Sequence, residues 1–192
     1  MPSERGLHDA PRTTSQVKIR RADEADFEPM WAIFHEIAAA GDTYVFSAET
    51  PRAEAFAYWF GPGVTSYVAE ADGRIVGLYK IVRNQPGRGS HVANASFMVA
   101  RGHRGGGVGR RMGEHALREA RAQGFLAMQF NFVVSTNVGA VGLWQSLGFA
   151  IVGTLPAVFR HQALGYVDAY VMYRSLADVD VDGREEHRRL DS

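Results

Sequence analysis

The segment from Val99 to Met112, VARGHRGGGVGRRM, most constrains what this chain can fold into. The segment begins at the end of an apolar, strand-like stretch, continues through a glycine cluster and ends in a helical pattern. Because glycines lack a Cβ, the backbone N–H groups of such a turn can converge on one anion, and the following helix points its positive end at the same place. Arg104, Arg110 and Arg111 flank the turn. The segment therefore predicts a cradle for a pyrophosphate.

Two familiar phosphate-binding patterns do not fit this segment. A nucleoside-triphosphate loop requires G-x-x-x-x-G-K-[ST], whereas Arg110 and Arg111 follow the last glycine. A dinucleotide fingerprint requires G-x-G-x-x-G/A, and neither reading frame places Gly or Ala at the last position. The pattern that fits is R-x-x-G-x-G, from Arg104 to Gly109. The alternative is a flexible glycine-rich loop, although such loops seldom open a helix.

Composition narrows the class of protein. With 192 residues, of which 46% are hydrophobic, the chain is long enough for one domain with a sizeable core. The formal net charge of zero gives no support for a nucleic-acid partner, but residues 101–121 hold six arginines against two glutamates, which suits an anionic ligand. The absence of cysteine excludes disulfides, thiol catalysis and cysteine-ligated metals.

The sequence gives no sign of a metal site, a signal peptide or a membrane-spanning segment. The seven histidines show no metal-ligand spacing, so we expect no metal. No signal-like or membrane-spanning apolar segment is present, so we expect a cytoplasmic protein without a membrane partner. Residues 1–16 are polar and predicted to be disordered, residues 17–175 form the predicted domain, and residues 176–192 are predicted to be a charged, flexible tail.

Hydrophobic periodicity predicts alternating strands and helices. Asp23 caps a helix that ends at Gly41, and Asp72-Gly73 is typical of a tight hairpin. The predicted strands cover residues 17–20, 66–71, 74–82, 91–99, 126–134, 150–154 and 167–173, and further helices follow Pro51, the glycine cluster and Asn137. The order β-α-α-β-β-β-α-β-α-β-β predicts a mixed central sheet of about seven strands with helices on both faces, in the α/β or α+β class.

This order of elements, together with the cradle, resembles the GNAT superfamily of N-acetyltransferases over roughly residues 17–175. A second motif, NVGAVGLWQSLGF from Asn137 to Phe149, is similar to that family's N-x-x-A-x-x-L-Y-x-x-x-G-F. The resemblance implies a GNAT-like fold and an acetyltransferase that uses acetyl-CoA as co-substrate. Direct transfer needs orientation, a neutral amine and a proton outlet, and no covalent nucleophile, in agreement with the missing cysteine.

The resemblance also implies which residues contact acetyl-CoA. The strand before the cradle typically carries a bulge, from which Phe97 and Val99 offer backbone groups to the pantetheine arm, and a backbone N–H near Met98 would stabilise the thioester oxyanion. The residues expected to bind acetyl-CoA are Phe97, Met98, Val99, Arg104, Gly105, Gly106, Gly107, Val108, Gly109, Arg110, Asn137 and Trp144.

Two departures from the family pattern bear on the chemistry. Trp144 replaces the usual Tyr that protonates the leaving thiolate, and an indole N–H is no acid near neutral pH. Either the thiolate leaves unassisted or another donor serves. The strand at 91–99 carries no carboxylate where many relatives have a general base. Instead, Asn94 and Asn131 stand on two strands expected to lie side by side and to diverge at the cofactor, which suggests that they orient the substrate; the alternative is that both satisfy local backbone groups.

The surroundings of these asparagines are similar to the GNAT subgroup that acetylates proline analogues such as azetidine-2-carboxylate and hydroxyproline. By that narrower resemblance, Asn94 and Asn131 are the catalytic residues. Further candidates for the acceptor pocket are Tyr44, His91, Asp168 and Tyr170, of which His91 could relay a proton near neutral pH; each also has a plain packing or strand-end interpretation.

The sequence therefore predicts an acetyl-CoA-dependent N-acetyltransferase that acts on a small amine or imino acid. Two alternatives stay open. One is a non-catalytic acyl-CoA-binding or sensing module, which the missing Tyr and Glu make conceivable, and the other is an acetyltransferase of protein or peptide amines. The oligomeric state also stays open, with a homodimer as one alternative.

Overall fold

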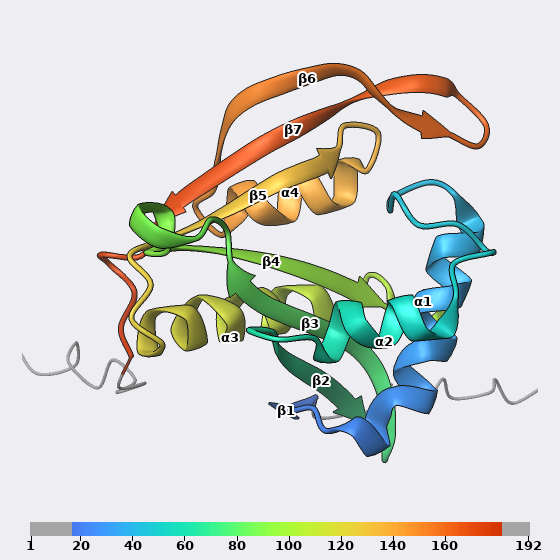
Figure 1. Ribbon diagram of the computed structural model, residues 1–192, viewed down its shortest axis with the longest axis horizontal. Coiled ribbons are helices and arrows are strands. Elements are labelled where there is room, and N and C mark those ends of the chain that lie inside the picture. The colour runs from blue at the N-terminus through green and yellow to red at the C-terminus, as the bar shows by residue number, and fades with distance from the viewer. Residues whose placement is uncertain (1–16, 182–192) are drawn as a thin grey trace, which may run out of the picture.

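The computed structural model describes residues 17–181, in which helices and strands alternate in the predicted order (Figure 1). The strands are β1 (Lys18–Arg21), β2 (Thr65–Ala71), β3 (Arg74–Arg83), β4 (Val92–Val99), β5 (Ala127–Val134), β6 (Ala150–His161) and β7 (Gly165–Ser175). The helices are α1 (Phe27–Ala40), α2 (Arg52–Phe60), α3 (Val108–Ala122) and α4 (Val138–Ser146), with short 3-10 turns at Glu24–Asp26, Gly87–Gly89 and Arg101–His103.

The seven strands form one mixed sheet in the order β1-β2-β3-β4-β5-β7-β6. The first four are antiparallel neighbours, β4 and β5 are parallel, and β5, β7 and β6 are again antiparallel. Asp72 and Gly73 have φ angles of 51° and 71°, as a two-residue hairpin turn between β2 and β3 requires. The mixed sheet with flanking helices confirms the predicted fold class.

Each face of the sheet is covered by a pair of helices (Figure 1). The helix α3 buries Val108, Met112, Ala116 and Ala120, spaced four residues apart, and packs with α4 on one face. The helices α1 and α2 pack on the other face around Phe34 and neighbouring apolar residues. Consecutive residues of β4 therefore face different helices, which fixes where its polar side chains lie.

The sheet opens between β4 and β5. Only Val92 with Ala127 and Ala93 with Met128 are paired, and beyond them the two strands separate. In β5 the register with β7 shifts between Phe130 and Val133, which marks a bulge at the same level. One edge of β4 is thus left without a strand partner, as the sequence predicts for the place where the two strands diverge.

Two strands differ from the sequence prediction. The strands β6 and β7 extend to His161 and from Gly165, so their hairpin continues past the end of β5 (Figure 1). Periodicity missed this extension because residues 155–166 contain Pro156 and lack strict alternation. The hairpin meets the loop between α1 and α2, since the Gln162 N–H donates to the Gly41 carbonyl at 3.0 Å.

The chain beyond β7 corrects the predicted start of the tail. Leu176 is fully buried, and Val179 packs against the same cluster of core residues. The packed part therefore extends a few residues past the predicted boundary at 175. The predictions for residues 1–16 and 182–192 concern segments outside the described residues. Within residues 17–181, no helix is both long enough and apolar enough to cross a membrane.

Candidate active site

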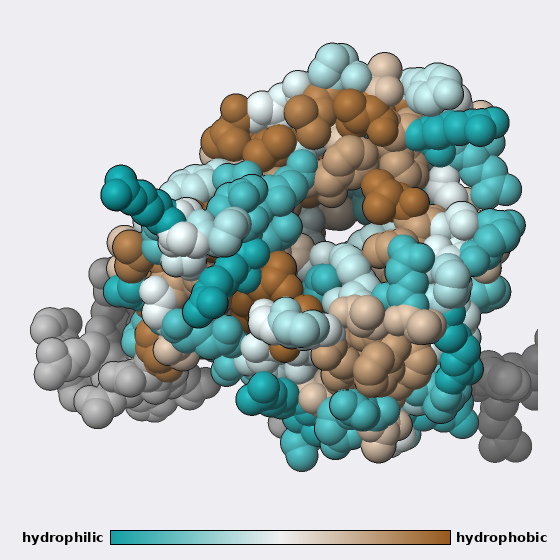
Figure 2. Space-filling view, in the orientation of Figure 1, coloured by the Kyte–Doolittle hydropathy of each residue, from teal (hydrophilic) through white to brown (hydrophobic). Residues whose placement is uncertain are grey.

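Two adjoining cavities lie where β4 and β5 separate. The first, named here the cradle cavity, has a volume of about 470 Å³ and lies against the glycine turn and the start of α3. The second, named the inner cavity, has a volume of about 260 Å³ and lies deeper between the two strands, under the loop that joins α1 to α2. Figure 2 shows the surface hollowed below the β6–β7 hairpin, at the mouth of this opening.

The glycine turn forms one wall of the cradle cavity. Gly105 and Gly107 have φ angles of 78° and 81°, which L side chains rarely adopt, and Gly107 is the N-cap of α3. A Cβ at either position would meet no protein atom within 4 Å, so the space beside both is open. His103, Arg104 and Arg110 line the same cavity. A helix N-terminus with three basic side chains fits a pyrophosphate group.

The remaining residues of the turn have other roles. Val108 is buried in the core, and Gly106 lies in the turn without lining the cavity. Gly109 lines the cavity from the first turn of α3, and its missing Cβ leaves room for Leu143, which such a Cβ would approach to 3.2 Å. Of the predicted turn residues, Gly105, Gly107, Gly109 and Arg110 therefore lie at the cavity, and Val108 and Gly106 shape the turn.

The open edge of β4 decides which backbone groups of the strand can meet a ligand. The strand pairs with β3 without a register shift, so the implied bulge is absent from this pairing. The Phe97 N–H donates to the Tyr44 hydroxyl at 3.0 Å and the Phe97 carbonyl accepts from it at 2.6 Å, so both backbone groups of Phe97 point away from β3. In an antiparallel ladder the direction alternates, and Met98 therefore points its N–H toward β3. The backbone N–H groups that face this edge are those of Phe97, which the Tyr44 hydroxyl accepts, and of Val99, whereas that of Met98 faces β3.

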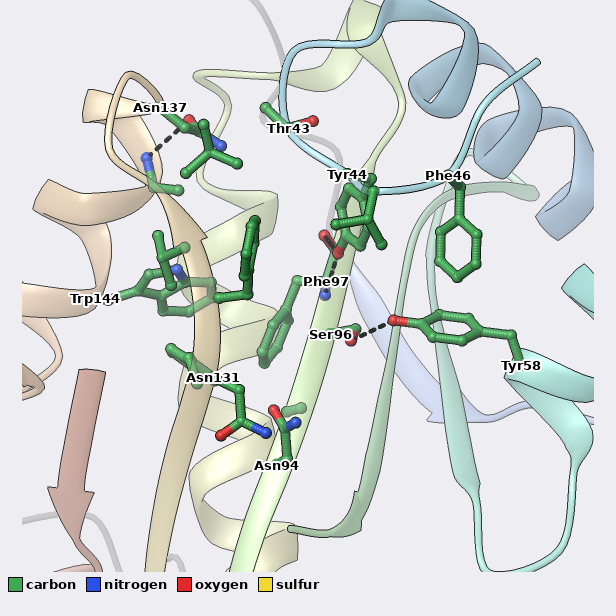
Figure 3. A pocket seen from close by; sticks show the side chains of 17 residues that line it. Thr43, Tyr44, Phe46, Tyr58, Asn94, Ser96, Phe97, Asn131, Asn137 and Trp144 are labelled. Atoms are coloured by element: carbon green, nitrogen blue, oxygen red, sulfur yellow. Dashed lines mark hydrogen bonds between the residues drawn. The ribbon is translucent and has the colours of Figure 1, made fainter. Parts of the chain in front are cut away.

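Asn94 and Asn131 come together in the inner cavity, as predicted (Figure 3). The Asn131 amide is held by two other amides: its Nδ2 donates to Oδ1 of Asn84 at 2.7 Å, and its Oδ1 accepts from Nε2 of Gln129 at 2.8 Å. No described residue hydrogen-bonds the Asn94 side chain, which points toward Asn131 (Figure 3). One asparagine is fixed and the other offers a donor and an acceptor to a ligand.

Sequence reasoning missed two hydroxyl groups of the inner cavity. The Tyr58 hydroxyl donates to Oγ of Ser96 at 2.6 Å, two residues along β4 from Asn94 (Figure 3). Burial raises the pKa of Tyr58, so this phenol keeps its proton at neutral pH. The alternation of polar and apolar residues in β4 could have indicated Ser96, which shares a face with Asn94. No described residue that lines the inner cavity carries a carboxylate or an imidazole.

Lys80 lies behind Tyr58, and its burial was also missed. Its ammonium group donates to the Tyr58 carbonyl at 2.7 Å and lies 3.0 Å from the centroid of the Tyr58 ring. The residue is 8% exposed, and desolvation lowers its pKa from 10.5 to about 7. The strand β3 is central and covered on both faces, which buries a lysine that strand alternation alone would place in solvent.

We expect the free energy of unfolding to depend on the protonation of Lys80. Its pKa is lower in the folded state, so between about 7 and 10.5 the unfolded chain binds more protons and stability rises with pH. Lys80→Met should remove this rise and stabilise the protein at pH 6 by roughly 2 kcal/mol, since no buried charge remains. Urea unfolding at pH 6 to 9 measures the effect; an unchanged pH dependence in the variant would contradict it.

Three predicted acceptor residues are not brought to either cavity. His91 is exposed and precedes β4. The Asp168 carboxylate accepts the Ala157 N–H at 2.8 Å, where Ala157 has a φ angle of 51° in an irregular part of β6. Tyr170 packs against the core on the side of α3 and α4. The fourth candidate, Tyr44, lines both cavities.

Asn137 and Trp144 also line both cavities, and their contacts are structural. The Asn137 Oδ1 accepts the Ala140 N–H at 3.3 Å and so caps α4. The Trp144 ring packs at 4.7 Å from Phe97 and 4.8 Å from Phe130, measured between ring centroids. This packing agrees with the interpretation that the indole has no chemical role.

We therefore expect Trp144→Phe to keep turnover within about tenfold of the parent protein, or ~1.4 kcal/mol in activation free energy. A phenyl ring preserves most of the apolar packing beside Phe97, and no proton is lost. Steady-state kinetics together with the affinity for CoA measure this. A loss above a thousandfold, in folded protein with normal CoA affinity, would show that the indole takes part in the reaction.

The comparisons with known proteins agree with this geometry. The profile of the Acetyltransferase (GNAT) family matches residues 31–149. The chain belongs to this family. A GCN5-related N-acetyltransferase from Kribbella flavida superposes with a TM-score of 0.79 at 44% identity, covering 83% of this chain and 97% of that chain. The protein yncA from Salmonella typhimurium, solved with acetyl-CoA, superposes with a TM-score of 0.75 at 23% identity, covering 93% and 99%.

A curated relative is N-acetyltransferase aca1 from Schizosaccharomyces pombe, which is 38% identical over 100 residues, covering 50% of this chain and 47% of the relative. The chain thus matches about half the length of this protein. These findings confirm the prediction of a GNAT acetyltransferase fold. Among residues 17–181, no group of three or more His, Cys, Asp or Glu side chains is placed to hold a metal ion.

Proposed function

We propose that the protein transfers an acetyl group from acetyl-CoA directly to a small amine or imino acid of the proline-analogue type. The observation that carries the proposal is the meeting of the two cavities at the unpaired edge of β4, where Phe97 lines both. A donor in the cradle cavity and an acceptor in the inner cavity would meet there. Holding both reactants in this way supplies much of the rate of a reaction that needs no covalent intermediate.

The cradle cavity would take the donor. The turn at Gly105 and Gly107 would bind the pyrophosphate through backbone N–H groups, with Arg104 and Arg110 beside it. The Phe97 N–H, once a bound thioester displaces the Tyr44 hydroxyl from it, would stabilise negative charge on the thioester oxygen, a role that the sequence suggested for an N–H near Met98. The names of the yncA structure and of aca1 support acetyl-CoA and N-acetyl transfer as the chemistry to test.

The inner cavity would take the acceptor. At about 260 Å³ it is slightly smaller than the ~300–1,000 Å³ typical of ligand pockets, which favours a small molecule over a peptide segment. Asn94 and Asn131 would hold the acceptor nitrogen through amide groups that cannot titrate, so the amine would arrive neutral or lose its proton to water.

A screen of acceptors tests this function. The protein is incubated with acetyl-CoA and azetidine-2-carboxylate, hydroxyproline, acyclic amino acids, or peptides with free N-termini and lysines, and release of CoA thiol is followed. We expect the highest kcat/KM for a small cyclic imino acid. Turnover of peptides alone would favour a protein acetyltransferase, and acetyl-CoA binding without turnover of any amine would favour a sensing module.

A further inference from the structure

The wall shared by the two cavities contains one acid. Six residues line both cavities: Thr43, Tyr44, Phe97, Asn137, Ala140 and Trp144. An acetyl group that passes from a donor in one cavity to an acceptor in the other must cross this shared wall. An aliphatic hydroxyl, an amide and an indole N–H are not acids near neutral pH, so among these residues only the phenol of Tyr44 can give up a proton to a leaving group.

The Tyr44 hydroxyl lies at the open edge of β4. It is held by both backbone groups of Phe97, at 3.0 Å from the nitrogen and 2.6 Å from the oxygen, although the two residues are 53 positions apart in the chain (Figure 3). In the structure the phenol therefore occupies the backbone N–H that the proposed function assigns to the thioester oxygen, and a bound thioester would displace it from this N–H while leaving it close by. With the donor and acceptor placed as in the proposed function, the hydroxyl would lie close to the thioester, since Tyr44 lines both cavities.

The environment keeps this phenol protonated. Burial, and the neighbouring Tyr58, raise the pKa of Tyr44 well above its ordinary value. The charged groups around it are few: no Asp, Glu, Lys or Arg lines the inner cavity, and His103, Arg104 and Arg110 lie at the pyrophosphate end of the cradle cavity. At neutral pH the group thus carries its proton.

We propose that Tyr44 is the general acid of the acetyl transfer, in place of the tyrosine that Trp144 replaces. This rests on the proposed function. As the acceptor nitrogen bonds to the acetyl carbon, the carbon–sulfur bond breaks, sulfur takes the electron pair, and the Tyr44 O–H transfers its proton to sulfur. The phenolate regains a proton from the newly acylated nitrogen through water, which leaves an amide, CoA thiol and the unchanged enzyme.

The experiment compares two donors in single turnover. One is acetyl-CoA and the other is its selenium analogue, acetyl-seleno-CoA, whose selenolate is a weaker base and leaves without protonation. Tyr44→Phe keeps the ring and removes the acid. We expect it to slow transfer from acetyl-CoA by about a hundredfold, the lower end of general-acid catalysis, and from the selenium analogue by less than about threefold. The variant is also titrated with CoA by calorimetry.

The matched control is Tyr67→Phe. Tyr67 is also a buried tyrosine, and its hydroxyl donates to Glu119 at 2.7 Å, away from both cavities. The Tyr67→Phe substitution should leave the rate of acetyl transfer from either donor unchanged. Equal slowing of Tyr44→Phe with both donors would overturn the proposal and make Tyr44 a positioning residue. Unchanged turnover with tighter CoA binding would also overturn it, since the hydroxyl would then only block the Phe97 backbone. Failure of wild type to bind CoA would instead contradict the proposed function.

Discussion

Replacing Asn94 or Asn131 by alanine is expected to lower kcat/KM for a small imino acid by 100- to 1,000-fold, or roughly 3–4 kcal/mol, and to leave the affinity for CoA nearly unchanged. Both amides line the inner cavity and neither lines the cradle cavity. An amide can fix the geometry of the acceptor but cannot remove its proton. The rate should therefore climb with pH toward the pKa of the acceptor itself.

The pH profile of kcat/KM separates this mechanism from base catalysis. The measurement uses wild type, both alanine variants and His91→Ala. Because His91 is exposed and lies outside both cavities, its removal should leave the wild-type profile unchanged. Near-normal rates in the asparagine variants would overturn the mechanism. A wild-type profile governed by a group with the ordinary histidine pKa of about 6.5 would also overturn the mechanism if the contribution of that group disappears in His91→Ala. His91 would then be the base.

Gly107→Val is expected to weaken CoA binding by about a hundredfold or more, on the order of several lost charge-assisted hydrogen bonds. Gly107 is the N-cap of α3 at a φ angle of 81°, beside the open space of the cradle cavity. A valine there disfavours the conformation and also places methyl groups where the pyrophosphate would lie. Calorimetric titration with CoA measures the loss.

The control for this variant is Gly124→Val. Gly124 has a φ angle of 88°, a Cβ there would meet no atom within 4 Å, and the residue lies at the opposite end of α3. The substitution carries the same backbone strain and should lower the melting temperature to a similar extent without changing CoA affinity. Equal affinities in Gly107→Val and wild type would overturn the assignment of the cradle.

The sequence predicted those features that residue type alone determines. Glycines in a turn that opens a helix indicate positive φ angles, and Gly105 and Gly107 have them. Asparagines in adjacent strands indicate a shared cavity, and Asn94 and Asn131 share one. In both cases the local residue pattern and the expected strand order predict the same arrangement.

Features that depend on register or on irregular segments could not be predicted. Whether Phe97 or Met98 points its N–H to the open edge depends on which residues of β3 and β4 form the hydrogen-bonded pairs, and side-chain types do not reveal this. The contact of Tyr44 with Phe97 joins a strand to a loop without periodicity. His91 misses the cavity because it lies at the end of β4 where the strand is still held to β5, before the two strands separate.

The hydrogen bond between the Gln162 N–H and the Gly41 carbonyl ties the α1–α2 loop to the β6–β7 hairpin, and this contact bears on how the two cavities could change in evolution. The glycine turn and the β4 edge, which line the cradle cavity, belong to the sheet and the start of α3. The inner cavity is instead covered by the α1–α2 loop, which is hydrogen-bonded to the tip of the β6–β7 hairpin. Insertions or substitutions around Val45 and Phe46, which line the inner cavity but not the cradle cavity, can reshape what enters the inner cavity. Changes at Tyr44 of the same loop would alter both cavities, because Tyr44 lines both.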